Sequence, residues 1–152
     1  MAKPFQFKLQ KVLDYRAQLE DQAKMDLARA QAAHDAQQRT VADIQRRLAA
    51  HVEQGFQDGR ADAEGVSPGD IWLWRQYKDA LEQDLTEAKA VLGKLALKLQ
   101  KARQVLVSRS KDKKLLEKLK EKQARRHHEE ESQREEKEFD ELAAIRHEPE
   151  NL

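Results

Sequence analysis

Histidines and acidic side chains are the residues of this chain that could hold a metal ion, and the first place to look is the segment HHEEE at residues 127–131. Adjacent residues point to different sides of a helix, whereas a metal site on one helix needs ligands three or four residues apart. None of the five histidines has another histidine four residues away. The segment is therefore interpreted as a solvated run of charges, and no metal ligand is predicted.

A second candidate is DGRADAEG at residues 58–65, which superficially resembles a calcium-binding loop. If Gly65 is aligned with the loop glycine, Arg60 takes the first ligand position and Ile71 the position of the bidentate glutamate. The segment is therefore predicted to be an acidic turn. No glycine-rich loop follows a strand, so no phosphate cradle is indicated. We expect no enzyme, no cofactor and no small-molecule substrate.

His34 and His51 fall on or beside the apolar stripe described below. Polar residues at such positions fix the register of a coiled coil, and this is the favoured interpretation. A pH-dependent switch is the alternative, because histidine titrates near neutral pH.

Two long helices must position all these residues. The three prolines lie at Pro4, Pro68 and Pro149, and four of the five glycines fall within residues 55–69. These helix-breaking residues predict a first helix over about 5–57, a turn over about 58–67 and a second helix over about 68–147. Ser67 can cap the second helix, with Asp70 at its positive end.

Apolar residues recur every three or four positions in both helices. In the first helix this stripe starts with Leu9 and Val12, and in the second it includes Ile71, Trp74, Leu81, Leu85, Ala88, Leu92, Leu95 and Leu99. This spacing and the single short turn predict one all-α domain, a long antiparallel two-helix coiled-coil hairpin about 80 Å in length. A bend near residues 60–66 pairs Leu9 with a residue near 118. Residues 128–152 then have no partner on the first helix, and we expect this charged segment to project as a single helix or to fray.

Charge is segregated along the second helix, although the net charge of the chain is only +1. Residues 98–126 are strongly basic and residues 129–141 strongly acidic. The basic segment could be a solvated face, could bind an acidic protein surface, or could bind nucleic acid. Nucleic acid is disfavoured because no aromatic residues are interleaved for base stacking.

Two apolar clusters exceed what a coiled coil requires. The first is PFQFKLQKVLDYR at residues 4–16, and the second is IWLWRQY at residues 71–77, which holds both tryptophans. A run such as IWLW covers most of the circumference of a helix, so one partner helix cannot bury it. Part of each cluster is predicted to dock a partner, since Trp and Tyr are favoured interface residues. The alternative is that Trp72 or Trp74 caps the end of the seam.

The chain has no cysteine, so disulfides and thiolate chemistry are excluded and a reducing cytoplasm is permitted. The sequence MAKPFQFKLQ does not read as a secretory signal, and no run approaches the ~18 apolar residues that a membrane-spanning helix needs. We expect a soluble or surface-bound protein.

The N-terminal residues also carry a family resemblance. The pattern Phe5, Phe7, Leu9, Val12, Leu13 and Arg16 resembles the N-terminal signature of the flagellar type III export protein FliJ family, an aromatic-x-aromatic-x-Leu-x-x-Val-Leu-x-x-Arg start. The length of 152 residues, the absence of cysteine and the expected hairpin agree with it. The stalk protein of virulence secretion systems is the alternative, and the N-terminal motif favours the flagellar form.

The resemblance implies a non-enzymatic stalk, similar to the central stalk of rotary ATPases, in the cytoplasm and peripheral to the inner membrane. Its partners would be the hexameric flagellar export ATPase, the cytoplasmic domain of the export gate and the export chaperones, with no nucleic acid. The ATPase would contact the six motif residues together with Leu115, Leu116 and Leu119. The gate would contact Tyr77 and Leu81, with Trp74 and Trp72 as neighbouring candidates.

Overall fold

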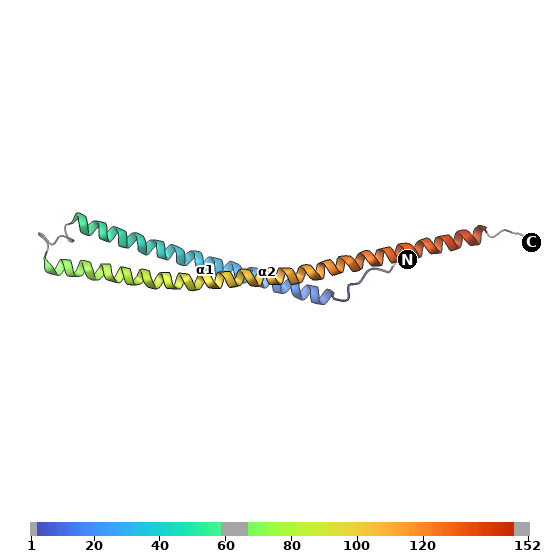
Figure 1. Ribbon diagram of the computed structural model, residues 1–152, viewed down its shortest axis with the longest axis horizontal. Helices are drawn as coiled ribbons and strands as arrows, with labels where there is room; N and C mark the ends of the chain where they lie inside the picture. Colours follow the sequence, from blue (N-terminus) through green and yellow to red (C-terminus); the bar gives the residue numbers. More distant parts are fainter. Residues whose placement is uncertain (1–2, 59–66, 148–152) are drawn as a thin grey trace, which may run out of the picture. The chain divides into compact units, whose positions relative to one another are not determined.

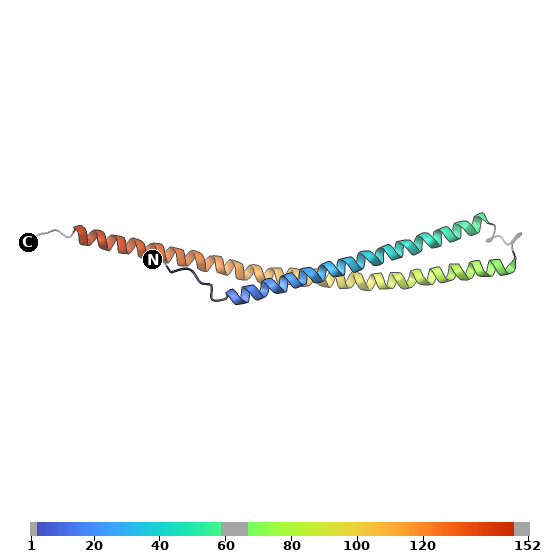
Figure 2. The same cartoon turned by 180° about the vertical axis from the view of Figure 1, so that it is seen from behind.

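The computed structural model describes residues 3–58 and 67–147. It contains two helices, α1 (Gln10–Gln57) and α2 (Pro68–His147), and no strand among the described residues. Figures 1 and 2 show the helices running in opposite directions. The prediction of an all-α antiparallel coiled coil is confirmed. The segment compared with a calcium-binding loop spans residues 58–65, and all of it except residue 58 lies outside the described residues.

The cap of α2 has the geometry expected from its sequence. The backbone N–H of Asp70 donates a hydrogen bond to Ser67 Oγ at 3.2 Å, and the N–H of Ile71 donates to the Ser67 carbonyl at 3.2 Å. Both bonds occupy N–H groups that the first turn of a helix otherwise leaves without a partner. The carboxylate of Asp70 also lies in the first turn, where the helix dipole favours negative charge.

The start of α1 differs from the prediction, because the helix begins at Gln10 and not near residue 5. In a helix Phe5 and Phe7 would point about 200° apart, at ~100° per residue, whereas in an extended segment residues two apart share one side. Phe7 is buried, and the Phe5 ring lies 5.8 Å from the ring of His127 on α2. His127 Nε2 also donates to the Lys3 carbonyl at 2.9 Å. Because residues 3–7 lie outside the helix, both phenylalanines can pack.

The chain forms two compact units, each containing parts of both helices. Unit 1 comprises Met1–Gln22 and Val107–Leu152, and unit 2 comprises Ala23–Leu106. In unit 2 the cyan and green part of α1 lies beside the green and yellow part of α2 (Figures 1 and 2). In unit 1 the blue start of α1 lies beside the orange part of α2, and the red part of α2 continues beyond it (Figure 1).

The core of unit 2 is a thin stripe along the facing sides of the helices. Its buried side chains are Ala23, Val41, Leu81, Ala88 and Leu99. The remaining predicted stripe positions of α2 are at least partly covered, including Leu85, Leu92 and Leu95. Gln37 Nε2 donates to the Ala88 carbonyl at 3.0 Å, which a small side chain at position 88 permits. The predicted stripe of α2 is therefore the observed one.

In unit 1 the buried side chains are Phe7, Leu13 and Glu20. Two residues placed on the stripe by their spacing, Leu9 and Val12, are instead 39% and 41% exposed. Leu9 lies in the turn before α1, so helical spacing does not apply to it. Val12 lies at the edge of the face that Leu13 and Glu20 define. The expectation that both pack in the seam was wrong.

The segment of α2 beyond His127 stays helical to His147. An ion pair between Arg134 and Glu131 at 3.5 Å, three residues apart, contributes to this helicity. Its large apolar side chains lie in solvent: Phe139 is 75%, Leu142 59% and Ile145 66% exposed. We call residues 128–146 the overhang.

Candidate partner-binding surfaces

The first candidate surface lies in unit 1, and we call it the terminal surface: Leu9, Val12, Leu115 and Leu119. Leu115 is 67% exposed, and Leu119 is one helical turn away on the same face. The other residues implied for the ATPase contact are less accessible. Phe7 and Leu13 are buried, and Phe5, Arg16 and Leu116 are half-buried. Those five offer a partner less surface than the four residues of the terminal surface.

Polar contacts fix how α1 and α2 pair beneath the terminal surface. Arg16 Nη1 donates to Asp112 Oδ2 at 3.0 Å, and Lys120 Nζ donates to Gln10 Oε1 at 2.7 Å. Both bonds join residues about 100 positions apart in sequence, so they define one register of the antiparallel pair. The Arg16 guanidinium, an implied ATPase contact, is thus engaged within the chain.

Lys113 and Glu20 form a third tie, with Nζ 3.3 Å from Oε1. Glu20 is buried, and its carboxylate, which accepts the hydrogen bond, raises the pKa of the Lys113 ammonium above its ordinary value. A raised pKa means that the pair stabilises the fold at pH values below the ordinary lysine pKa. That contribution is lost as pH rises through the pKa of the folded state.

The second candidate surface is built on Trp74, near the end of unit 2 where α2 begins. Trp74 Nε1 donates to the His51 carbonyl at 3.2 Å, and His51 Nε2 donates to the Trp74 carbonyl at 2.9 Å. The two rings are stacked, with centroids 5.2 Å apart and an interplanar angle of 21°. Trp74 is thus bound reciprocally to α1 and is the tryptophan that faces the seam.

Tyr77 and Lys78 complete this cluster. The Tyr77 ring meets the edge of the His51 ring at 4.7 Å, and Lys78 Nζ lies 5.8 Å from the centroid of the Trp74 ring. Each aromatic contact of this kind is worth about 0.5–1.5 kcal/mol beyond the area it buries. His51 therefore orients two aromatic side chains of α2.

Gly55 is essential to this packing, and the sequence interpretation assigned it only to the turn region. The residue lies within α1 and is buried, and a Cβ atom added there would overlap the indole of Trp74. Glycine costs a helix interior about 1 kcal/mol relative to alanine, so its presence signals a close approach. That signal, a glycine inside a helix that ends at Gln57, was available in the sequence.

The exposed side chains around this cluster form what we call the turn surface: Phe56, Trp72, Leu73 and Tyr77. They are 64%, 60%, 60% and 52% exposed, respectively. Trp72 is therefore the outward-facing tryptophan. Leu73 belongs to the cluster at residues 71–77 that was predicted to dock a partner in part, but it was not named for the gate contact. Phe56 was not singled out.

Leu81 requires a correction among the residues implied for the gate contact. It is only 5% exposed and lies in the core of unit 2, because it follows Trp74 and Lys78 on the seam side of α2. Tyr77 is four residues away but at the edge of the seam, where half of its surface remains accessible. The pair does not form one exposed face, and Leu81 supports the surface from the core.

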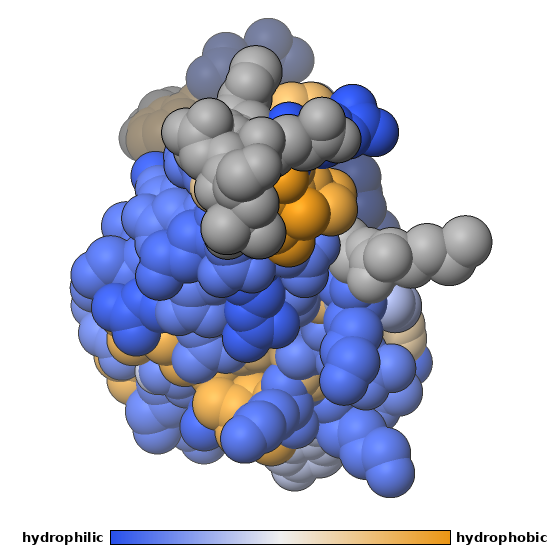
Figure 3. Space-filling model, turned by 90° about the vertical axis from the view of Figure 1, so that its right-hand side faces the viewer, coloured by the Kyte–Doolittle hydropathy of each residue, from blue (hydrophilic) through white to orange (hydrophobic). Residues whose placement is uncertain are grey.

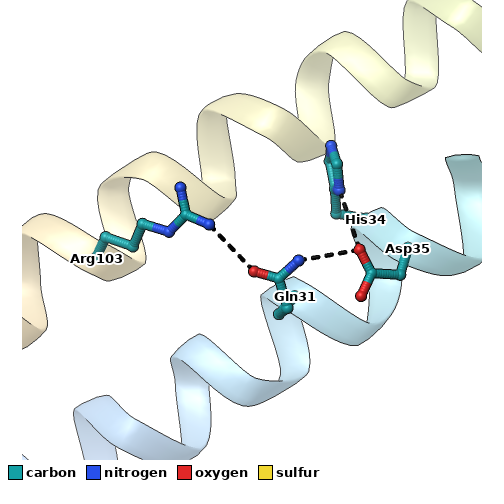
Figure 4. Close-up of polar contacts among 4 residues, drawn as sticks. All are labelled: Gln31, His34, Asp35 and Arg103. Atoms are coloured by element: carbon teal, nitrogen blue, oxygen red, sulfur yellow. Dashed lines mark hydrogen bonds and ion pairs between the residues drawn. The ribbon is translucent and has the colours of Figure 1, made fainter.

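A polar network crosses the seam farther along unit 2 (Figure 4). Arg103 Nη2 on α2 donates to Gln31 Oε1 on α1 at 3.2 Å, and Gln31 Nε2 donates to Asp35 Oδ1 at 2.9 Å. His34 Nδ1 lies 3.4 Å from the same carboxylate oxygen. Gln31 can satisfy both neighbours only in this orientation of its amide. The network gives His34 a partner within the seam.

We expect Asp35→Asn to lower stability at pH 7 and to matter less in acid. The hydrogen bond from Gln31, followed by that from His34, holds the pKa of the Asp35 carboxyl below its ordinary value. Because folding lowers this pKa, the ionised carboxylate of Asp35 stabilises the fold at pH values above the pKa of the unfolded state. This contribution is lost as pH falls through the lower pKa of the folded state. Urea unfolding of both proteins at pH 7 and below pH 4 gives the comparison. A stability difference that grows on acidification would contradict this assignment.

Within the described ranges, no group of three or more His, Asp or Glu side chains is arranged to hold a metal ion. Neither described helix contains a stretch long and apolar enough to cross a membrane.

Comparison with known proteins identifies the family. A family model described as flagellar FliJ protein matches residues 5–151. The chain belongs to this family. The N-terminal resemblance is thereby confirmed, and the chain is a coiled-coil protein of a type III export family. No curated protein matches the chain.

A solved structure gives an independent comparison of the fold. It is described as that of a YscO homologue, CT670, from Chlamydia trachomatis, and its TM-score to this chain is 0.62. The alignment covers 95% of this chain and 96% of that chain at 20% sequence identity. At this identity the likeness concerns the fold alone.

Proposed function

We propose that this chain is a non-enzymatic stalk of the flagellar type III export apparatus, and so serves flagellum assembly and motility. Family membership supports the setting, and the exposed apolar side chains of the terminal surface support a protein-binding role. Leu115, at 67% exposure on a helix already paired with α1, is the observation that carries the argument. Large exposed apolar side chains grouped in this way are typical of interfaces.

In this proposal the terminal surface of unit 1 docks into the hexameric export ATPase and promotes its assembly and activity. A ring pore suits a paired helix whose apolar residues face outward. Lys8, Lys11 and Lys118 flank the surface and are exposed, so they would add attraction to an acidic pore lining.

The turn surface of unit 2 is proposed to bind the cytoplasmic domain of the export-gate membrane protein. Trp72 and Tyr77 would make the contact, and Trp74 and Leu81 would hold them in place. Export chaperones are proposed as further partners. The stalk would act in the cytoplasm, peripheral at the inner membrane.

The test is hydrolysis by a hexameric flagellar export ATPase at increasing concentrations of this chain. We expect stimulation, and we expect Leu115→Ala/Leu119→Ala to raise the half-maximal concentration about tenfold or more. Burying a leucine side chain contributes about 1.5–3 kcal/mol, and 1.4 kcal/mol corresponds to a factor of ten.

Leu97→Ala/Val105→Ala is the matched control, because both residues are exposed on α2 but belong to unit 2. It should stimulate like the wild type. Normal stimulation by the folded Leu115→Ala/Leu119→Ala variant would rule out the terminal surface as the ATPase contact.

A further inference from the structure

The overhang carries a surface that the proposed stalk function leaves unused. Two adjoining shallow grooves lie along it, one lined by Ser132, Glu135, Glu136, Phe139 and Asp140 and the other by Phe139, Leu142, Ala143 and Arg146. Phe139 belongs to both, and its side chain is 75% exposed. We call this the acidic surface: an apolar stripe flanked by carboxylates.

A surface of opposite charge lies earlier on the same helix. Its groove is lined by Leu115, Lys118, Leu119, Glu121, Lys122 and Arg125. Two exposed leucines are thus flanked by two lysines and an arginine, with one glutamate at the edge. We call this the basic surface. Figure 3, which views the right-hand side of Figure 1, shows hydrophobic patches on a largely hydrophilic exterior.

The two surfaces lie on one stripe of α2. Leu115 and Lys122 are related to Glu136 and Ala143 by 21 residues, which is three heptads, and the same step relates Lys118 to Phe139. Residues at equal heptad positions share one side of a helix in a coiled coil. The side chains at 115, 118, 122, 125, 136 and 139 are all exposed. The stripe is therefore a second seam without a partner helix in this chain.

The two surfaces cannot meet within one chain. They lie on one helix about 20 residues apart, which is about 30 Å at 1.5 Å per residue. Two copies of α2 in antiparallel orientation bring each acidic surface against the basic surface of the other copy. Such a pair is two-fold symmetric, so each complementary contact is made twice.

We infer that a second copy of this chain occupies the stripe, and that two chains associate through antiparallel α2 segments 115–146. Carboxylates of Glu135 and Glu136 face Lys118 and Lys122 of the other copy, and Phe139 packs against its Leu115 and Leu119. A parallel pair is disfavoured because it would set lysines against lysines and glutamates against glutamates, which costs stability.

The association also covers Leu115 and Leu119 of the terminal surface. It therefore excludes ATPase docking as proposed above, and a dimer would be a resting form of the stalk. The dimer itself does not depend on the proposed function, and its test uses no ATPase.

The test is a charge-reversal exchange measured by sedimentation of the full chain between about 1 and 300 µM in low salt. The wild type should shift with concentration from 17.6 kDa to twice that mass. Lys118→Glu/Lys122→Glu alone and Glu135→Lys/Glu136→Lys alone should each raise the midpoint concentration tenfold or more. An equimolar mixture of the two variants should associate again, because each surface then meets its complement on the other chain.

Three results would overturn the inference. The first is a wild type that stays at 17.6 kDa over the whole range, which would leave the stripe to a different partner. The second is association of both charge-reversed variants, each alone, like the wild type, which would place any dimer contact elsewhere. The third is a mixture that fails to associate although its helicity by circular dichroism is unchanged, which would exclude the antiparallel pairing. Leu97→Ala, on the exposed face of unit 2, is the control and should leave the midpoint unchanged.

Discussion

Gly55→Ala should destabilise unit 2 by about 0.5–1.5 kcal/mol, although alanine is the better helix former by about 1 kcal/mol. A methyl group at position 55 would overlap the indole of Trp74, so the ring must move. Its displacement breaks the hydrogen bond to the His51 carbonyl, worth about 1 kcal/mol, and the stacking with the His51 ring, worth about 0.5–1.5 kcal/mol. Urea unfolding followed by tryptophan fluorescence reports the change, because both tryptophans lie in unit 2.

The sign of this effect depends on Trp74 alone, which makes the prediction specific. In a Trp74→Ala background the obstacle is absent, and Gly55→Ala should then stabilise the chain by about 0.5–1 kcal/mol. Gly93→Ala provides the matched control, since no atom lies within 4 Å of a Cβ at that position of α2. It should stabilise in both backgrounds. Stabilisation by Gly55→Ala in the wild-type background would show that the indole is not held against α1.

The reciprocal bonds between His51 and Trp74 illustrate what sequence could and could not predict. Periodicity placed both residues on or beside the seam, and the run IWLW indicated that one tryptophan would remain exposed. The 3/4 spacing that runs back from Leu81 through Lys78 reaches Trp74 and not Trp72, so local spacing favours Trp74 for the seam. Which residue of α1 the indole meets depends on the register of α2 against α1. That register is set by contacts between residues far apart in sequence, such as those of Arg16 and Gln37, and local spacing does not encode it.

The N-terminal segment shows a second limit. The motif residues Phe5 to Arg16 were assigned to one helix, and under that assumption Leu9 and Val12 belonged in the seam. Alternation with period two, Phe5-x-Phe7-x-Leu9, was equally visible and indicates an extended segment. The helical signal that follows was stronger, so the boundary was placed too early. Contacts with His127, which is more than 100 residues away, stabilise the non-helical segment.

The cap of α2 and its stripe were predictable because their signals are local. Ser67, Pro68 and Asp70 specify a helix start within four residues, and the α2 stripe repeats over many turns without an insertion. Exposure was harder to predict. Leu81 and Tyr77 share helical spacing, yet one is buried and the other is half accessible, because a narrow two-helix seam covers only a limited arc of each helix.

Leu81→Ala should therefore cost about 2–4 kcal/mol of stability, the range for truncating a buried leucine. The side chain is 5% exposed, and the two-helix core has few other large residues to fill the space that it leaves. Leu97→Ala, at a position 61% exposed on the same helix, is the matched control and should change stability by less than about 0.5 kcal/mol. Urea unfolding monitored by circular dichroism measures both.

The Leu81→Ala variant also tests whether Leu81 contacts the export gate directly or only supports the turn surface from the core. If Leu81 acts only through the core, binding of Leu81→Ala to the cytoplasmic domain of the export gate should recover when sucrose or trimethylamine N-oxide restores folding. Trp72→Ala, at 60% exposure, should keep its helicity and stay deficient in binding with or without the osmolyte, because it removes the contact itself. Persistent loss of binding by a refolded Leu81→Ala chain would mean that the seam opens at Leu81 when the gate binds. The buried leucine would then be part of the interface.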